Sequence, residues 1–299
     1  MTPRPAVQPT ILLAPTLELA RSLGPASVSV EAEYGGVVVE GYRYTAAHHT
    51  ESHRGNPPPC VDFHIPTVRE GEVILVSHLD LDTLGGVLRA MGQLDLLGPR
   101  AAGFWDLAAF VDVHGPHHLP MAKARPRDVA ALQAWWAWSK EGIPRFPRDK
   151  VSDITEDITR AARALQGILE GDQELLLAGE KFAREEKALN LRTFTRKEGP
   201  VIVRLAGACG DFCNHLYQTP GGQAGEAVAC FNRETGAVTV SLAQPTSGVS
   251  CRELVQSLWG PEAGGHPGIA GSPRGRLMSE GELERAIQTL SSLLQRQEE

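Results

Sequence analysis

One stretch of the sequence, residues 70–92, constrains the fold more than any other: EGEVILVSHLDLDTLGGVLRAMG. Residues 73–76 form a short continuous apolar run, which predicts a strand buried on both faces. Apolar residues then recur at positions 84, 87, 88 and 91, which is the spacing of an amphipathic helix. The polar turn between strand and helix holds His78, Asp80 and Asp82. Because open α/β sheets bind ligands at the carboxyl ends of their strands, we expect a site at this turn.

The rest of the N-terminal half continues an α/β pattern. Residues 27–44 alternate apolar and polar side chains around Gly35 and Gly36, which predicts a hairpin. Residues 45–66 are rich in histidine, proline and glycine, which predicts a long exposed loop. We expect a second strand at residues 107–113, with Asp112 at its end, and helices over 127–140 and 151–188.

The C-terminal half predicts a smaller domain. Its pattern indicates a strand at 201–207, a short helix at 213–220, a hairpin at 227–242 that turns at 234–236, an amphipathic helix at 251–259, a glycine-rich turn and a terminal helix. The polar stretch 192–199 predicts an interdomain linker. The expected fold class is therefore α/β with two domains and a cleft between them. Residues 1–190 would form a mostly parallel sheet flanked by helices, with 1–70 as an N-terminal extension, and residues 198–299 a mixed sheet.

The composition narrows the class of protein. The net charge of −7 argues against a broad basic surface for long nucleic acids. No apolar run is long enough to span a bilayer, so we expect no membrane partner. Five cysteines are few and odd in number, which favours a reducing, cytoplasmic location over a disulfide scaffold. Cys209 and Cys213 lie near His215 but lack the second half of a zinc site, so we interpret them as buried small side chains.

Eight of the ten histidines fall between His48 and His118, a stretch that also holds several aspartates. In an extended segment His78, Asp80 and Asp82 would share one face, and crowded carboxylates need a cation between them. Oxygen and imidazole ligands suit manganese, magnesium, iron or zinc. Asp112 would join this group if the two predicted strands are neighbours, with three further histidines over it: His114, His117 and His118.

Plainer interpretations exist for the same residues. A single D-x-D at a strand end often only caps a helix, with Asp82 or Thr83 bonding the free amides. His48, His49, His53 and His64 are more typical of a solvated loop than of metal ligation. The tryptophan-rich run 134–138 is suited to stacking on bases, but its helical pattern favours packing.

Two motifs resemble those of a known family. The segment VSHLDLDTLGGVLRA is similar to the first motif of the DHH phosphoesterases, a strand followed by H-x-D-x-D-x-x-G-G, in the form found in the single-strand exonuclease branch. Residues 236–271 resemble the C-terminal DHH-associated domain, whose glycine-rich loop corresponds to AGGHPGIAG at residues 263–271. The resemblance extends over residues 71–299.

The resemblance implies a metal centre. In that family the first motif binds paired manganese ions, so His78, Asp80 and Asp82 would be ligands, with Asp112 bridging the ions. The contiguous Asp-His-His motif of the family is absent, and the chain has DVHGPHH at residues 112–118 instead. His114 would then be a further ligand, and His117 and His118 would be the catalytic histidines. A further family aspartate has three candidate counterparts here: Asp149, Asp153 and Asp157. Mg²⁺ and Zn²⁺ are alternatives to Mn²⁺.

The glycine-rich C-terminal loop is the expected substrate contact. Glycines let backbone amides approach an anion closely, and His266 with Arg274 and Arg276 would supply hydrogen bonds and charge. Gly264 and Gly265 would form the concavity. Alternatively, this loop is only a turn between two elements.

The sequence thus predicts a metal-dependent phosphoesterase, a possible homodimer, that hydrolyses short oligonucleotides, nucleotide phosphates or cyclic dinucleotides with a metal-activated water. One alternative is a non-catalytic DHH-like binding or scaffold module, which the missing Asp-His-His motif favours. Another is an unrelated zinc hydrolase built on the His48–His64 loop, in which Asp82 would be dispensable.

Overall fold

The computed structural model describes residues 9–34, 37–53, 55–207, 211, 213–273 and 276–296. Their contacts divide the chain into two compact units: unit 1 comprises residues 1–113 and 122–182, and unit 2 comprises residues 114–121 and 183–299. Both units combine helices with a sheet, as the predicted α/β class requires. None of the helices in the described part of the chain is long and apolar enough to cross a membrane.

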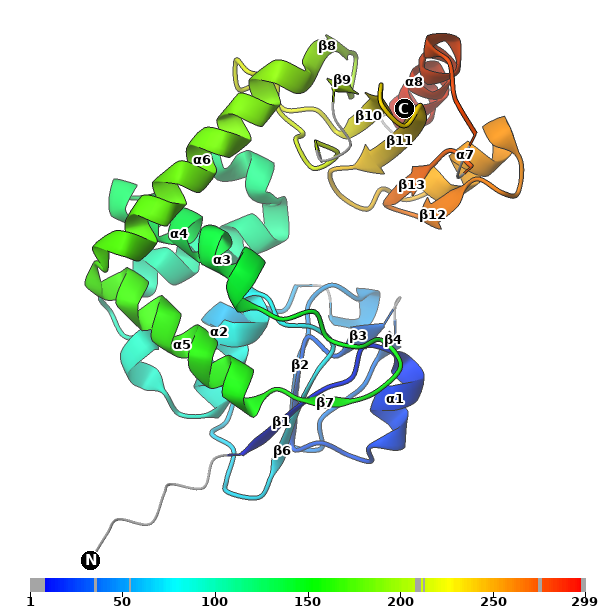
Figure 1. Ribbon diagram of the computed structural model, residues 1–299. Helices are drawn as coiled ribbons and strands as arrows, with labels where there is room; N and C mark the ends of the chain where they lie inside the picture. Colours follow the sequence, from blue (N-terminus) through cyan, green and yellow to red (C-terminus); the bar gives the residue numbers. More distant parts are fainter. Residues whose placement is uncertain are drawn as a thin grey trace, which may run out of the picture. The chain divides into compact units, whose positions relative to one another are not determined.

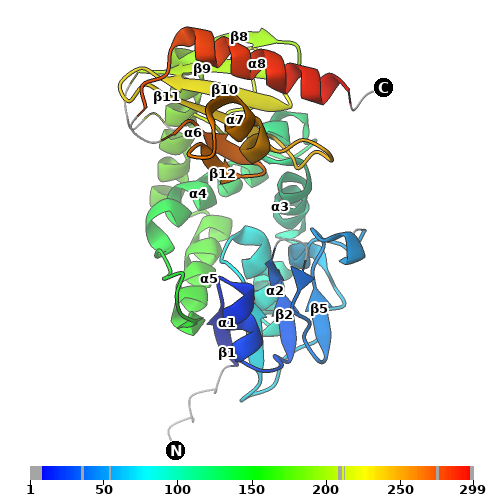
Figure 2. The same ribbon diagram turned by 90° about the vertical axis from the view of Figure 1, so that its right-hand side faces the viewer.

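Unit 1 is built on sheet A, whose strand order is β5 (Tyr44–Ala46), β2 (Val28–Val30), β6 (Val73–Val76), β1 (Thr10–Leu13) and β7 (Ser152–Asp153). The first four strands are parallel and β7 is antiparallel. Helix α1 (Leu17–Ser22) packs on the face that holds Leu75, and helices α2 (Leu81–Ala90) and α5 (Thr155–Glu170) lie on the other face (Figures 1 and 2). The predicted strand at 73–76 and the helix after it are confirmed.

The predicted hairpin at 27–44 forms only at its centre. Strands β3 (Glu33–Tyr34) and β4 (Val37–Val38) pair antiparallel, whereas the flanking β2 and β5 lie parallel in sheet A. The reason is burial: all three residues of β2 are buried, and a strand inside a parallel sheet is covered on both faces. The 3-10 helices η1 (Glu51–His53) and η2 (Pro59–Val61) follow β5.

Two predictions of secondary structure need correction. Residues 107–113 are not a strand but the end of helix α3 (Ala102–His114), because a short apolar run fits a buried helix as well as a buried strand. The single helix expected over 151–188 is two helices, α5 and α6 (Gln173–Thr193), which Gly171 separates with a left-handed φ of 94°. Helix α4 (Pro126–Gly142) matches its prediction, and η3 (Leu94–Leu97) was not predicted.

The predicted linker at 192–199 is wrong. Helix α6 runs to Thr193, and the next residues form strand β8 (Phe194–Glu198). Its side chains alternate between half-buried and exposed, as expected for an edge strand with one solvated face. The polar residues of that solvated face gave the segment the composition of a linker.

Unit 2 is built on the mixed sheet C, in the order β12 (Gly264–His266), β13 (Ile269–Gly271), β11 (Ala237–Leu242), β10 (Ala227–Asn232), β9 (Val201–Ala206) and β8. Only β9 and β10 pair parallel. Helices α7 (Cys251–Trp259) and α8 (Glu280–Gln295) cover one face with the larger core. The opposite face carries a small apolar cluster that includes Leu189 of α6.

Two further predictions in unit 2 differ from the structure. The hairpin at 227–242 is confirmed, but residues 213–220 form turns rather than a helix, because Arg204 and a bridge from Gln218 to Ala224 engage backbone groups that a helix would use. The glycine-rich turn is itself a hairpin, β12–β13. Gly265 has a φ of 151°, and a Cβ there would lie 2.4 Å from the Ile269 carbonyl oxygen.

Candidate metal centre

Acidic and histidine side chains meet at the carboxyl ends of the parallel strands of sheet A. Glu31 directly follows β2, His48 follows β5, and His78 follows β6. Because β2 lies between β5 and β6, these three connections leave the sheet at the same edge. The structure therefore places polar groups where the sequence predicted a ligand site, and draws them from more strands than predicted.

Five of these side chains form what we call the His48 cluster: Glu31, His48, His49, Asp82 and Asp112. His48 Nε2 lies 3.0 Å from Asp112 Oδ2, 3.5 Å from Glu31 Oε1 and 3.6 Å from Asp82 Oδ2. On its other side, Glu31 directs Oε2 to His49 Nε2 at 3.3 Å. His48, Glu31 and Asp82 are buried, whereas the His49 side chain is half-exposed. The cluster thus has a closed interior and one open side.

The interior of the cluster is unsatisfied. Glu31 Oε1, His48 Nε2, Asp82 Oδ2 and Asp112 Oδ2 are buried, and none of these atoms has a hydrogen-bond partner within the described structure. Buried polar atoms are almost always hydrogen-bonded because an unpartnered one costs free energy. Three of these atoms, on His48, Asp82 and Asp112, belong to groups whose ligand atoms all lie within 4.8 Å of one another, which indicates a binding position rather than a structural network.

Electrostatics in the cluster point the same way. Burial raises the pKa of Glu31 and of Asp82, and repulsion from a neighbouring carboxylate adds to this, from Asp82 on Glu31 and from Asp112 on Asp82. Burial opposes protonation of His48, but the facing carboxylates of Asp112, Asp82 and Glu31 outweigh it and raise the pKa of His48 to about 10. Without another cation, protonated His48 is the positive charge that holds these carboxylates together.

Asp82 is positioned by the turn at η2. Its Oδ1 accepts a hydrogen bond from the Cys60 backbone N–H at 2.9 Å, which leaves Oδ2 directed at His48. Arg89 donates to the Cys60 carbonyl oxygen and fixes that turn. A Cβ at Gly85 would lie 2.4 Å from the Cys60 Cβ, so the first glycine of the motif is needed for η2 to pack on α2.

A second carboxylate positions the histidines. Glu33 accepts hydrogen bonds from the backbone N–H groups of His48, His49 and Thr50 at 3.2, 3.3 and 2.8 Å. Glu31 has a φ of 50°, the only positive φ among the described non-glycine residues. Backbone strain of this kind is concentrated at functional sites. The predicted exposed loop at 45–66 is therefore wrong at its start, because Glu33 draws His48 into the interior.

His78 and Asp80 form a half-exposed pair at 3.2 Å beside the cluster. The expectation that they share one face with Asp82 is wrong because α2 begins at Leu81 and turns Asp82 inward. Asp80 is the N-cap and accepts a hydrogen bond from the Thr83 N–H at 2.9 Å, so the motif does cap the helix, but through Asp80 rather than through Asp82 or Thr83 as the plainer interpretation expected. Burial opposes protonation of His78, but Asp80 outweighs it, with help from Glu31 and Asp112, and raises its pKa to about 9.

The structure brings Asp112 into the cluster from helix α3 rather than from a strand. The three predicted histidines belong to unit 2. His114 ends α3, and His117 and His118 lie in η4 (Pro116–Met121), which belongs to unit 2. His117 is buried with its ring 5.2 Å from that of Tyr217, and burial lowers the pKa of His117 to about 4.

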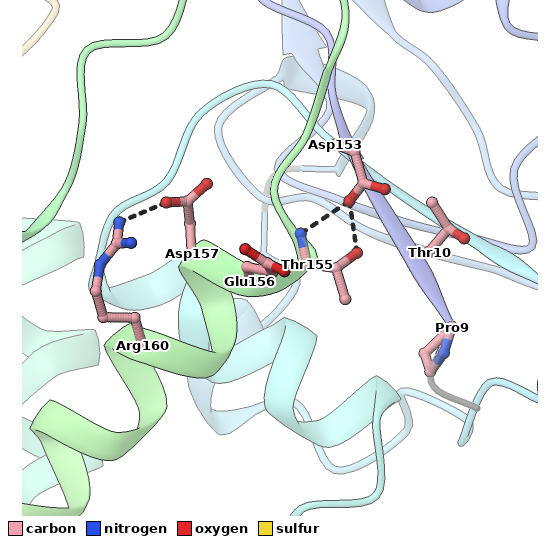
Figure 3. Close-up of a pocket in the computed structure, with 7 residues that line it drawn as sticks. All are labelled: Pro9, Thr10, Asp153, Thr155, Glu156, Asp157 and Arg160. Carbon is pink, nitrogen blue, oxygen red and sulfur yellow. Dashed lines mark hydrogen bonds and ion pairs between the residues drawn. The ribbon is translucent and has the colours of Figure 1, made fainter. Parts of the chain in front are cut away.

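The candidate downstream aspartates lie elsewhere. Asp153 accepts hydrogen bonds from Thr155, and Asp157 pairs with Arg160. Figure 3 shows both around a pocket of about 560 Å³ beside Thr10, at the amino end of β1, whereas the cluster lies at the carboxyl ends of the strands. Asp149 is exposed and takes no part in the cluster.

The predicted substrate loop lies on the β12–β13 hairpin. Gly264, Gly265 and His266 form the exposed strand β12, and the glycine conformation serves the hairpin. Arg276 is paired with Glu282 at 3.0 Å. Arg274 lies outside the described residues. The tryptophan run packs as expected, with Trp135 buried and its ring 5.1 Å from that of Trp138.

Sequence reasoning missed Glu31 and Glu33 and gave too little weight to His48 and His49. One signal was available: Glu31 directly follows the predicted strand residues Val28–Val30, and His78 likewise comes soon after the predicted strand at 73–76. The adjacent histidines also follow a short strand.

Comparisons with known proteins add little. No family model and no curated protein matches the chain. One solved structure, an uncharacterized protein from Helicobacter pylori G27, is similar at 12% identity with a TM-score of 0.20, over 78% of this chain and 77% of that one.

Proposed function

We propose that the chain is a metal-dependent hydrolase of phosphate esters, and that the His48 cluster is its metal centre. The observation that carries this proposal is the set of four buried, unpartnered atoms on Glu31, His48, Asp82 and Asp112. A cation held by His48, Asp82 and Asp112, whose ligand atoms all lie within 4.8 Å of one another, would satisfy three of these atoms and replace the proton on His48 as the compensating charge.

The donor set supports a divalent ion. Ligands about 2.1 Å from a metal lie about 3.0–3.5 Å from one another in octahedral and tetrahedral sites. The separations of 3.0, 3.5 and 3.6 Å from His48 Nε2 are close to this range. Three carboxylates with one imidazole suit Mn²⁺ best, with Mg²⁺ and Zn²⁺ as alternatives. Glu31 also faces His49 through its second oxygen, which supports a second ion on the open side.

We propose phosphate esters as the substrates because of the motif at residues 76–90. A divalent ion at this position would polarise a phosphate oxygen and lower the pKa of a bound water. His78 and His49 are half-exposed at the edge of the cluster, where they can donate hydrogen bonds to a phosphate. The resemblance of residues 76–90 to the first DHH motif supports short oligonucleotides, nucleotide phosphates or cyclic dinucleotides as substrates. A cytoplasmic location is part of the proposal, supported by four free, buried cysteines among the described residues.

The test is hydrolysis of bis-p-nitrophenyl phosphate by chelator-treated protein with Mn²⁺, Mg²⁺ or Zn²⁺ added back. We expect Mn²⁺-dependent turnover that Asp82→Asn abolishes. The matched control is Asp153→Asn, an aspartate at the other end of the sheet, which should leave turnover unchanged. Metal binding without turnover on any phosphate ester would favour the scaffold alternative, and zinc-dependent turnover that survives Asp82→Asn would favour a zinc hydrolase.

A further inference from the structure

Unit 2 contains two buried cysteines whose sulfur atoms face each other. Cys230 lies in β10, and Cys213 lies in the segment between β9 and β10. Their Sγ atoms are 3.3 Å apart, close enough for one thiol to donate a hydrogen bond to the other sulfur. Both are free, and they lie in the small apolar cluster of sheet C with Leu189, Ile202 and Val228.

A buried cation lies beside this pair. Arg204 is opposite Cys230 in the β9–β10 register and is fully buried. Its guanidinium donates five hydrogen bonds, all to neutral oxygens, on Leu216, Gln218, Thr193 and twice on Asn190. No carboxylate of the described residues pairs with it. A buried positive charge without a carboxylate favours a thiolate next to it.

The two thiols are consequently unequal. The hydrogen bond from Cys230 and, against burial, the charge of Arg204 lower the pKa of Cys213 to about 7. The same hydrogen bond, together with burial, raises the pKa of Cys230. These contacts favour ionisation of Cys213 over that of Cys230.

The other two described cysteines differ in this respect. Burial raises the pKa of Cys60 and raises that of Cys251 to about 11. Neither has another cysteine sulfur within hydrogen-bond distance in the described structure. Thiols of this kind are inert, so they serve as internal controls for the pair in unit 2.

We propose that Cys213 and Cys230 are an oxidisable dithiol that hydrogen peroxide converts into an intramolecular disulfide, with Cys213 as the attacking sulfur. The Cys213 thiolate attacks one peroxide oxygen, the O–O bond breaks, and hydroxide leaves, which gives a sulfenic acid. Cys230 then attacks the same sulfur: the S–S bond forms, the S–O bond breaks, and the sulfenic oxygen leaves with the Cys230 proton as water. Both sulfurs are oxidised, and one peroxide is reduced to water and hydroxide.

The disulfide would act on the segment between β9 and β10. It would close a loop between residues 17 positions apart and fix the chain that Arg204 already holds at Leu216 and Gln218. Loop closure removes entropy from the unfolded chain, so oxidation should raise the melting temperature of the protein by several degrees. This proposal is independent of the metal centre in unit 1.

The experiment treats the reduced, chelator-treated full chain with hydrogen peroxide, alkylates the remaining thiols and maps disulfides by mass spectrometry without reduction. We expect a peptide linked through Cys213 and Cys230 that dithiothreitol separates. Cys230→Ser should stop the reaction at a sulfenic acid on Cys213, which dimedone labels, and Cys213→Ser should leave residue 230 unlabelled. Cys251→Ser and Cys209→Ser are matched controls that should still form the link.

Three results would overturn the proposal. The first is full retention of both thiols in the folded protein under conditions that oxidise it in urea. The second is a disulfide that pairs Cys209 or joins two chains. The third is dimedone labelling spread evenly over all the cysteines, because it would show that Cys213 has no special reactivity.

Discussion

The two units differ in how they satisfy their buried charged groups. In unit 2, Arg204 is fully buried and its five donated hydrogen bonds satisfy its guanidinium. In unit 1, the His48 cluster leaves four buried atoms without a hydrogen-bond partner. Burial imposes a similar desolvation cost on both. A satisfied network stabilises its own unit, whereas an unsatisfied one is stabilised by something it binds.

This difference predicts opposite responses to mutation, the largest at Arg204. Arg204→Met should destabilise the protein by at least about 3 kcal/mol, because it leaves buried carbonyl, amide and hydroxyl oxygens without a donor. Metal affinity should not change. Urea unfolding followed by fluorescence measures the free energy.

The matched control for Arg204 is Arg196→Met on the neighbouring strand β8. Arg196 is partly exposed and pairs with Glu284 and Glu198, so its loss should cost no more than about 1 kcal/mol. If both substitutions lowered the free energy of unfolding by the same amount, the buried hydrogen-bond network of Arg204 would contribute no more than the surface ion pairs of Arg196.

At the cluster we expect the reverse pattern. Asp112→Asn should weaken Mn²⁺ binding by at least about 100-fold because it removes a ligand. The metal-free protein should lose no stability, since one of three crowded carboxylates is gone. Calorimetry measures the Mn²⁺ affinity, and unfolding in the presence of a chelator measures the stability of the metal-free protein. If the metal-free variant did not fold, the cluster would have a structural role instead.

Glu33 tests how the histidines are positioned. Glu33→Gln should weaken Mn²⁺ binding by about tenfold, because an amide cannot accept all three hydrogen bonds from residues 48–50. The control is Glu72→Gln, a carboxylate that accepts from the Arg69 N–H just before β6. If Glu72→Gln weakened binding equally, the positioning argument would fail.

The smallest effect is on pH dependence. The pKa of His48 is raised from its ordinary value of 6.5 to about 10, so metal-free protein gains stability from protonated His48 below pH 6.5 and loses it as the pH rises through about 10. Metal must displace that proton, so Mn²⁺ affinity should rise with pH by up to about tenfold per unit within this window. Calorimetric titrations of Mn²⁺ at several pH values, in buffers with different enthalpies of ionisation, would measure how many protons are released when the metal binds.

The sequence predicted the local part of the site and missed the long-range part. The strand at 73–76 and the helix after it follow from periodicity, although the cap of that helix is Asp80 and not Asp82 or Thr83. Periodicity could not show that residues 107–113 are helical, nor that Glu33 pulls His48 inward. These contacts depend on packing between segments far apart in the chain, which a local pattern does not encode.

The most direct test of the metal centre is calorimetric titration of Mn²⁺ into chelator-treated protein, wild type beside Asp112→Asn. The structure predicts saturable binding of at least one ion per chain in the wild type, with proton release, and loss of that binding in the variant. No binding in the wild type, or the same affinity in Asp112→Asn, would contradict the assignment of the His48 cluster as a metal centre.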